Sequence, residues 1–248
     1  MHATVTVVAS NEALAEAAAQ AVADAAEDAV KQTGRFTLAL SGGSAPRRLY
    51  ARLASPPFRS RIDWARLDVF WGDERCVSPD HPDSNYRLAD ESLLSKVPIP
   101  PEQIHRMRGE DSDPERAALD YSQELMRAFS LKPGAHPRFD LVLLGLGADG
   151  HTASLFPGSP ALNENRRLAV ATYAEPIKAY RLTLTLPVLN AAAQVIFLVS
   201  GAEKAEVLRA VLQDRPSPSR PASLVRPERG TLWFVDRAAT ARLRDTSG

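Results

Sequence analysis

The sequence predicts an α/β fold with a mostly parallel β-sheet that is covered by helices on both faces. Short β-rich runs alternate with helical patterns from one end of the chain to the other, which is typical of such sheets. The run "QVIFLVSG" (residues 194–201) is apolar over almost its whole length, as expected of a buried strand. Glycine-rich or charged motifs directly follow four predicted strands, at the sheet edge where ligands bind in this class of fold.

The composition is that of an ordinary globular protein. Of the 248 residues, 44% are hydrophobic and 24% are charged. This length is sufficient for a sizeable core, and we expect a single domain over residues 1–248. The 30 basic and 30 acidic residues leave a formal net charge of zero, so nothing favours a nucleic acid or an anionic membrane as partner.

Cysteine usage and the absence of targeting signals predict a cytoplasmic protein. The single cysteine, Cys76, excludes an internal disulfide and a cysteine-rich zinc site. The N-terminal segment lacks a basic region and contains Glu12, Glu16 and Asp24, so we expect no secretory signal. No apolar run approaches the ~18 residues of a membrane span. No surface pattern indicates an oligomer, and we expect a monomer.

The first elements are strands separated by helices. "TVTVVAS" (residues 4–10), "RFTLAL" (residues 35–40) and "RLDVFW" (residues 66–71) have the composition of strands, and the last one breaks at residues 72–75. Residues 11–34 place apolar side chains at helical spacing, with Gly34 as a C-cap. Pro46 is expected at the first position of a helix that continues over residues 47–54.

The rest of the chain continues this alternation. Residues 84–94 are predicted as a helix, and Asp113 and Pro114 start the next helix, through residue 129. "FDLVLLG" (residues 139–145) and "LAVATYA" (residues 168–174) are predicted strands, and the alternating "RLTLTL" (residues 181–186) predicts a strand with one solvated face. A short helix, a buried strand, a helix, a proline-rich surface loop and a final strand are expected at residues 187–193, 194–201, 202–213, 214–227 and 231–235.

A possible anion site follows the second strand. Ser41, Gly42, Gly43 and Ser44 offer backbone N–H groups, two hydroxyls and the positive end of a helix dipole, which suit a phosphate group. A plain strand-to-helix turn explains the glycines equally well. Lys204 favours anion binding, because a cation in the first turn of a helix opposes the dipole unless an anion compensates it. A solvated surface lysine is the alternative.

The segment "LVLLGLGADGHTASLFPGSP" (residues 141–160) contains Gly145, Gly147 and Gly150 at the spacing of a dinucleotide-binding turn. In such turns the third glycine opens a long helix. Here Pro157 and Gly158 stop any helix after about two turns. We therefore expect these glycines to allow a tight turn and a close approach of the backbone to a ligand, with no nicotinamide cofactor.

His151 and Asp149 are candidate catalytic residues of this turn. A histidine titrates near pH ~6.5, which suits a general base at neutral pH, and a nearby carboxylate can orient the imidazole. A structural or merely exposed histidine is the alternative. A metal site in "PDHPDSN" (residues 79–85) is disfavoured, because adjacent positions in a proline-bent loop rarely converge on one ion. We expect no metal and no other cofactor.

As a set, these motifs resemble the glucosamine-6-phosphate isomerase/6-phosphogluconolactonase family. The similar segments occur in the family's order over nearly the whole chain: "LALSGGSAPRRLY", "VFWGDERCVSPDHPDSNYRLADESLL", "FDLVLLGLGADGHTASLFPG", "RLTLTLPVLN", "SGAEKAEVL" and "PASLVRP" with the terminal "LWFVD". The resemblance implies a three-layer, modified doubly wound (Rossmann-like) α/β fold without a cofactor. It also implies hydrolysis of a small-molecule sugar-phosphate lactone, 6-phospho-D-glucono-1,5-lactone, to 6-phospho-D-gluconate in the oxidative pentose phosphate pathway.

The resemblance also implies the roles of individual residues. The family's catalytic histidine falls on His151, with Asp149 beside it, and its phosphate ligands fall on the turn from Ser41 to Ser44, Arg75, Arg181 and Lys204. Asp73 matches a proton-transfer base of the related isomerases, and here it is expected to touch the substrate or to hold Arg75 or the loop. Backbone N–H groups of residues 147–150, or Arg75, are alternative donors to an oxyanion.

Two other functions stay open on the sequence. One is an isomerase or deaminase of a hexosamine 6-phosphate, but those relatives have a tyrosine where Arg75 stands and a glutamate where Phe156 stands. The other is a sugar-phosphate-binding module without catalysis, which would retain the anion turns but need no base. Such modules usually accompany a DNA-binding segment, for which this chain has neither room nor basic charge.

Overall fold

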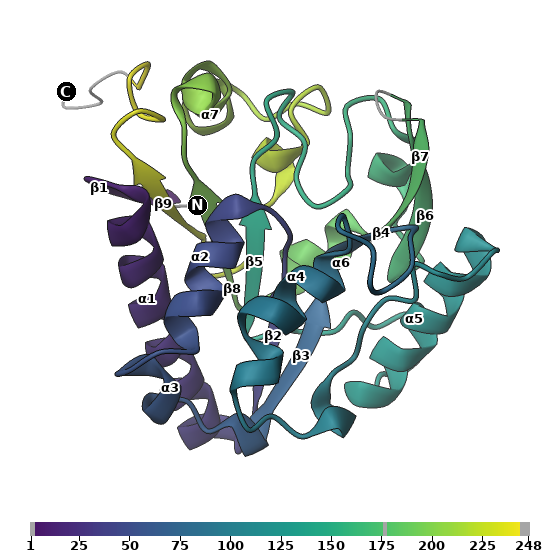
Figure 1. The fold of residues 1–248 in the computed structure, drawn as a ribbon. Coiled ribbons are helices and arrows are strands. Elements are labelled where there is room, and N and C mark those ends of the chain that lie inside the picture. The colour runs from purple at the N-terminus through teal and green to yellow at the C-terminus, as the bar shows by residue number, and fades with distance from the viewer. Residues whose placement is uncertain (1–2, 176–177, 244–248) are drawn as a thin grey trace.

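The computed structural model describes residues 3–175 and 178–243, and its centre is a six-stranded sheet (Figure 1). The strand order is β1-β9-β8-β5-β2-β3, and every neighbouring pair is parallel. β2, β5 and β8 are almost wholly buried, as expected of central strands covered on both faces. The six strands are Ala3–Val8 (β1), Phe36–Leu40 (β2), Leu67–Trp71 (β3), Leu141–Gly145 (β5), Gln194–Val199 (β8) and Thr231–Asp236 (β9).

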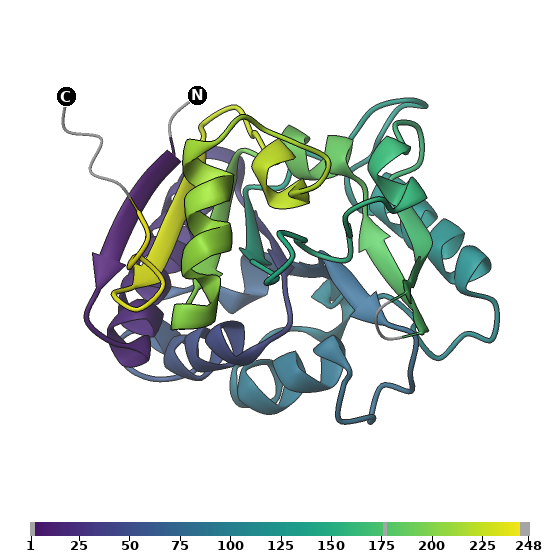
Figure 2. The same cartoon turned by 90° about the horizontal axis from the view of Figure 1, so that it is seen from above.

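The helices lie on both sides of this sheet. α1 (Asn11–Thr33) and α2 (Ser44–Leu53) pack together on the side turned to the viewer in Figure 1, and Figure 2 shows the yellow-green 3-10 helix Pro221–Leu224 on the other side. The three-layer α/β fold predicted from the sequence is confirmed. The remaining α-helices of the described residues are Phe58–Arg61 (α3), Asn85–Ser92 (α4), Pro114–Ala128 (α5), Leu186–Ala191 (α6) and Ala205–Gln213 (α7).

Local sequence signals set the ends of the helices. Ser10 accepts a hydrogen bond from the N–H of Ala13 and caps α1, and Gly34 ends that helix with a φ of 81°. Asp113 caps α5 ahead of Pro114, as predicted. α2 begins at Ser44, so the prediction that Pro46 opens it is wrong by two residues. A proline fits there because the N–H groups of the first helical turn have no helical acceptor.

The topology of the sheet determines where a ligand can bind. β2 lies beside β5, but the chain continues from β2 to β3 on one side and from β5 to β8 on the other. Such a reversal leaves a crevice beyond the carboxyl ends of the two strands. The turns after β2 and β5 therefore meet at this crevice. No helix of the described residues is long and apolar enough to cross a membrane.

A second, antiparallel sheet was not predicted from the sequence. It has the order β4-β7-β6, built from Asp73–Arg75 (β4), Ala179–Leu184 (β7) and Ala169–Ala174 (β6). The chain passes from one sheet to the other at Gly72. Its N–H donates to the carbonyl of Leu40 at 2.8 Å, and its carbonyl accepts from the N–H of Leu184 at 2.8 Å. The predicted break after β3 is therefore the start of a new strand.

The prediction that one face of "RLTLTL" is solvated is wrong. Thr183 and Thr185 are fully buried, at 0% exposure. Thr183 lies in β7, the middle strand of the second sheet, and accepts from the N–H of Ser154, whereas Thr185 lies between β7 and α6. Their hydroxyls donate to backbone carbonyls of Leu184 and Arg167, at 3.0 and 2.8 Å. A threonine whose hydroxyl is hydrogen-bonded can be buried in the core. The alternation of threonine with leucine therefore does not indicate a solvent-exposed face.

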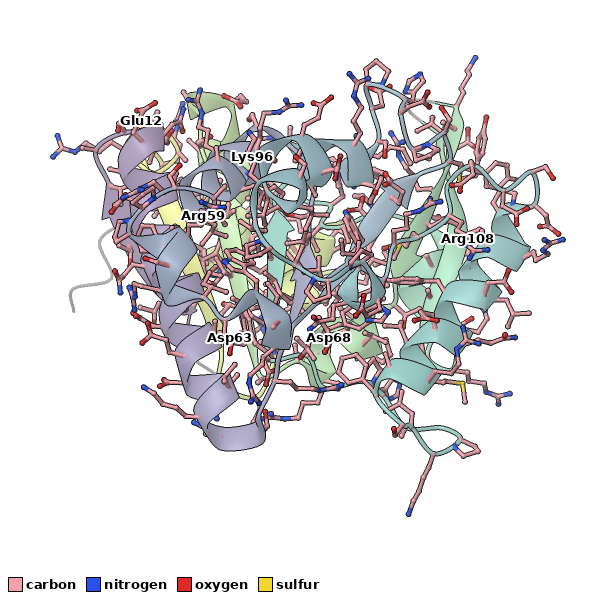
Figure 3. The ribbon with its side chains drawn as sticks, turned by 60° about the horizontal axis from the view of Figure 1, so that its bottom comes forward. Glu12, Arg59, Asp63, Asp68, Lys96 and Arg108 are labelled. Carbon is pink, nitrogen blue, oxygen red and sulfur yellow. The ribbon has the colours of Figure 1, made fainter. Side chains whose placement is uncertain are left out.

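His105 forms a charged cluster away from the crevice. Its Nδ1 lies 2.7 Å from Glu124 and its Nε2 lies 3.3 Å from Asp68, while its ring stacks on Phe70. Asp68 is near the amino end of β3, on the side of the molecule that Figure 3 brings forward. Burial lowers the pKa of His105, but the hydrogen bonds to Asp68 and Glu124 outweigh it, so the pKa lies above its ordinary value of 6.5.

This raised pKa predicts a pH-dependent stability. The protonated His105 stabilises the fold fully below pH ~6.5, and this contribution is lost as the pH rises through the higher pKa of the folded state. His105→Gln is expected to lower the free energy of unfolding by about 1–3 kcal/mol at pH 5.5 and by less at pH 8.5. Urea denaturation of the wild type and the variant at both pH values measures this difference in the free energy of unfolding. The exposed His81→Gln is the control, and an equal loss for His105→Gln at both pH values would contradict the assignment.

Candidate active site

A cavity of about 420 Å³ lies beyond the carboxyl ends of β2, β5 and β8. Every site residue predicted from the sequence lines it except Asp149, which lies behind His151 and bonds to it. The lining therefore combines the turn after β2, the start of the second sheet, the loop after β5 and the segment after β8. The predicted residues in its wall are Ser41, Gly42, Gly43, Ser44, Asp73, Arg75, His151, Arg181 and Lys204.

The turn from Ser41 to Ser44 is held by the hydrophobic core. The hydroxyl of Tyr50, a fully buried residue of α2, accepts from the N–H of Ser41 at 2.9 Å and donates to its carbonyl at 2.7 Å. Gly43 has a φ of 109°, which a residue with a side chain rarely adopts. Within the described residues, the N–H groups of Gly42 and Gly43 have no acceptor, so they remain available to an anion at the start of α2.

Three cationic side chains enter the cavity from two directions. Arg75 and Arg181 face each other across the β4 and β7 ladder, and Lys204 immediately precedes α7. Burial and the neighbouring charge of Arg75 hold the pKa of Arg181 below its usual range. No described carboxylate forms a salt bridge with any of the three, and Arg75 donates instead to the carbonyl of Asp83. An anionic ligand would relieve this repulsion.

The loop after β5 closes on itself at Gly147. The N–H of Gly147 donates to the carbonyl of His151 at 2.9 Å, and the N–H of Gly150 donates to the carbonyl of Gly147 at 3.0 Å. Among the described residues no helix opens at Gly150, so this turn lacks the long helix that dinucleotide-binding turns start. A Cβ at residue 147 would lie 2.1 Å from Nδ1 of His151. Glycine is required there so that the imidazole can lie against the backbone.

His151 and Asp149 form a close pair. Nδ1 of the imidazole lies 2.5 Å from Oδ1 of Asp149, and because a carboxylate only accepts, Nδ1 carries the proton. Burial raises the pKa of Asp149, but the N–H and the imidazole of His151 together hold it below the usual range. Nε2 has no hydrogen-bond partner in the described parts of the chain, and the ring packs against Phe156 at 4.6 Å between centroids.

Asp73 connects the loop after β5 to α4. Its Oδ2 accepts from the hydroxyl of Ser154 at 2.7 Å, and its Oδ1 and carbonyl accept from the amide of Asn85 at 3.3 and 2.9 Å. Asp73 forms no salt bridge with Arg75 among the described residues, and its carboxylate instead bonds to Ser154 of the loop after β5. Because Asp73 also lines the cavity, its contact with the substrate stays a prediction.

Asn85 and Ser154 are the site residues that the sequence did not reveal. Neither follows a strand directly, so the rule that places ligands at strand ends could not find them. Ser84 signals the start of α4 by capping it, but nothing in the sequence shows that the next side chain points to Asp73. Only the fold brings Asn85, Ser154 and Asp73 together.

A metal site and a second cavity are the two alternatives among the described residues. No group of three or more His, Cys, Asp or Glu side chains among them is placed to hold a metal ion. A second cavity, of about 920 Å³, lies beside β6 and β7 on the far side of Phe156. Its lining includes Asp149 and one arginine, Arg167, which is already paired with Glu115 and Glu164, so this cavity suits a phosphorylated ligand less well.

Known proteins are similar to this chain in sequence and in fold. Residues 9–234 match the profile of the family described as glucosamine-6-phosphate isomerases/6-phosphogluconolactonase. The chain belongs to this family. A family member from Synechocystis sp., called 6-phosphogluconolactonase, is 42% identical over 245 residues, which cover 98% of this chain and 100% of the relative.

Solved structures are similar to this chain in fold. The 6-phosphogluconolactonase from Trypanosoma brucei superposes with a TM-score of 0.88 at 32% identity, covering 98% of this chain and 99% of that chain. A monomeric glucosamine-6-phosphate deaminase superposes with a TM-score of 0.79 at 21% identity, covering 96% and 99% of the two chains. The second likeness shows a shared fold alone.

The position of Gly147 predicts the effect of adding one methyl group. In Gly147→Ala the new Cβ would lie 2.1 Å from Nδ1 of His151 and 2.7 Å from Oδ1 of Asp149, so the pair must separate. We expect loss of the hydrogen-bonded Nδ1 proton in the NMR spectrum and a destabilisation of about 1–3 kcal/mol. Gly145→Ala is the matched control, because its Cβ would meet nothing within 4 Å. An unchanged Nδ1 signal in Gly147→Ala would contradict the geometry.

Proposed function

We propose that this chain hydrolyses 6-phospho-D-glucono-1,5-lactone to 6-phospho-D-gluconate, with His151 as general base. One observation carries the proposal: an imidazole fixed by Asp149 leaves Nε2 free in a cavity that also holds Arg75, Arg181 and Lys204. A base beside an anion site fits a phosphorylated substrate whose reaction needs one activated water. The activity of the family members named above supports the same substrate.

His151 activates the water and later returns the proton. Nε2 takes a proton from the water as the oxygen attacks C1 of the lactone, which gives a tetrahedral intermediate. The bond between C1 and the ring oxygen then breaks, and the imidazolium donates its proton to that oxygen. The product is an open chain with a carboxylic acid that ionises in solvent. Asp149 keeps the imidazole in the right tautomer and stabilises the imidazolium.

Arginine supports the charge that develops on the carbonyl oxygen. The N–H groups of Gly147, Gly150 and His151 are already used inside the turn, where they donate to His151, Gly147 and Asp149. This use removes Gly147 and Gly150 from the predicted backbone donors and leaves only Ala148 and Asp149 of residues 147–150. Arg75 retains N–H groups beyond the one that bonds to Asp83, so it is the better candidate donor.

The remote phosphate provides the binding energy that positions C1. We assign it to the turn after β2, where free N–H groups meet the start of α2, together with Lys204 and Arg181. Binding of the phosphate holds C1 of the lactone next to the water that His151 activates. A nucleophile stronger than this water is therefore not required. Burial raises the pKa of Cys76 to about 11, so this thiol stays protonated at neutral pH and does not act as one.

The chain lacks the carboxylate beside His151 that the isomerase alternative requires. Phe156 packs on the ring of His151 at the position where related isomerases have a glutamate. An apolar ring there excludes water from one side of the imidazole and provides no second proton acceptor. Release of ammonia from glucosamine 6-phosphate by the purified protein would favour the alternative. The cytoplasmic location and the monomeric state stay predictions.

Replacement of the base tests the reaction directly. His151→Ala is expected to lower kcat about 10²- to 10⁴-fold and to leave KM nearly unchanged, because the phosphate site is intact. Freshly generated 6-phosphogluconolactone, with EDTA present, is the substrate, and spontaneous hydrolysis is subtracted. A wild-type rate equal to the background would refute the lactonase, and an unchanged rate in the variant would remove His151 from the mechanism.

Replacement of the cation after β8 tests the phosphate site. Lys204→Ala is expected to raise KM for the phosphorylated lactone about 10- to 100-fold, because it removes one charge-assisted contact. Hydrolysis of unphosphorylated gluconolactone should change little. Lys96→Ala, on the surface after α4, is the control for loss of a positive charge. Equal losses on both lactones would refute the assignment of Lys204 to the phosphate.

A further inference from the structure

Two buried polar atoms in the cavity wall have no partner. Among the described residues, Oγ of Ser41 and Oδ1 of Asn85 accept and donate no hydrogen bond, although the two residues are only 4% and 1% exposed. Both residues line the cavity. Burying an unpartnered polar atom costs about 1–3 kcal/mol, so such atoms indicate that a ligand completes the site.

The orientation of the Asn85 amide is fixed by its neighbours. Its Nδ2 lies 2.9 Å from the carbonyl of Asp73 and 3.3 Å from Oδ1 of Asp73, and both of these atoms can only accept. The NH₂ group must therefore face Asp73, and Oδ1 must face the turn after β2. The backbone of Asn85 is held as well, because its N–H donates to Glu74 at 2.7 Å.

The free oxygen of Asn85 selects the chemistry of its partner. An amide oxygen accepts hydrogen bonds and cannot donate, so it does not suit a phosphate dianion, whose oxygens also only accept. It suits a hydroxyl. The Ser41 hydroxyl either donates or accepts, and it lies one residue from Gly42, against which Oδ1 of Asn85 packs so closely that a Cβ there would stand 1.8 Å away.

We propose that Oδ1 of Asn85 and Oγ of Ser41 form a subsite that binds secondary hydroxyl groups of the sugar ring. The proposal rests on the lactonase function proposed above. It assigns the side chain of Ser41 to a hydroxyl, while the free backbone N–H groups of the following glycines serve the phosphate. Asn85 thereby becomes a specificity-determining residue that rejects lactones without the matching hydroxyl.

Substrates that lack one hydroxyl test this subsite. The 2-deoxy, 3-deoxy and 4-deoxy forms of 6-phosphogluconolactone are compared with the parent lactone by kcat/KM. For at least one analogue, the wild type is expected to lose about 10- to 100-fold relative to the parent, because Oδ1 is then left unpaired. In Asn85→Ala the same ratio should approach one. Comparing ratios cancels the differences in chemical reactivity between the lactones.

Ser154→Ala is the matched control. It also removes a hydrogen bond to Asp73, at 2.7 Å, but it leaves Oδ1 of Asn85 in place. We expect it to slow all lactones equally and to keep the wild-type ratios. Ser41→Ala should reduce the ratio for the same hydroxyl or for one adjacent to it on the ring, which supports the two-atom subsite.

The outcomes separate the subsite from the function. If the wild type hydrolyses the parent lactone but loses less than about threefold on every analogue, the subsite is refuted, even if the variants fail to fold. Asn85→Ala with unchanged ratios and uniformly lower rates shows a structural role and also refutes it. A wild type that does not hydrolyse the parent lactone overturns the proposed function, and the subsite with it.

Discussion

Two adjacent buried carboxylates, Asp73 and Glu74, hold the cavity together. Side chains alternate along β4, so the two groups point in opposite directions and each needs its own donors. Asp73 takes them from Asn85 and Ser154, and Glu74 takes backbone N–H groups of Arg75, Asn85 and Tyr86, each at 2.7 Å. Burial raises the pKa of Glu74 in spite of these donors. The start of α4 and the loop of His151 are thereby tied to one strand of three residues.

Tyrosine hydroxyls hold the ends of two strands in a common way. Tyr50 bonds both backbone groups of Ser41, and Tyr121 accepts from the N–H of Trp71 at 2.9 Å and donates to its carbonyl at 3.1 Å. Each phenol hydroxyl bonds the two backbone groups that a neighbouring strand would otherwise bond at the end of the parallel ladder. The rings themselves are packed in the core, so the position of the binding turn depends on core packing as well as on the turn residues.

The sequence predicted what depends on local chemistry, and it failed where distant segments combine. Capping residues such as Gly34 and Asp113 set the ends of their own helices through local interactions. The motifs that follow parallel strands come together because all parallel strands end at the same edge of the sheet. The antiparallel sheet was missed because β4 has only three residues and its partner follows more than a hundred positions later. Asn85 was not predicted as a site residue for a related reason, because only the fold brings its side chain to Asp73.

The charge distribution has a consequence for how fast a substrate is captured. The chain has a formal net charge of zero, yet Arg75, Arg181 and Lys204 stand in the cavity without salt-bridge partners among the described residues. A dianion far from the surface therefore meets no net attraction, and the field of the three cations extends only about 8 Å at physiological ionic strength. The dianion therefore reaches the mouth of the cavity by diffusion, and electrostatic attraction to the three cations acts only over the last part of its path. Added salt would weaken the final binding step far more than the encounter rate.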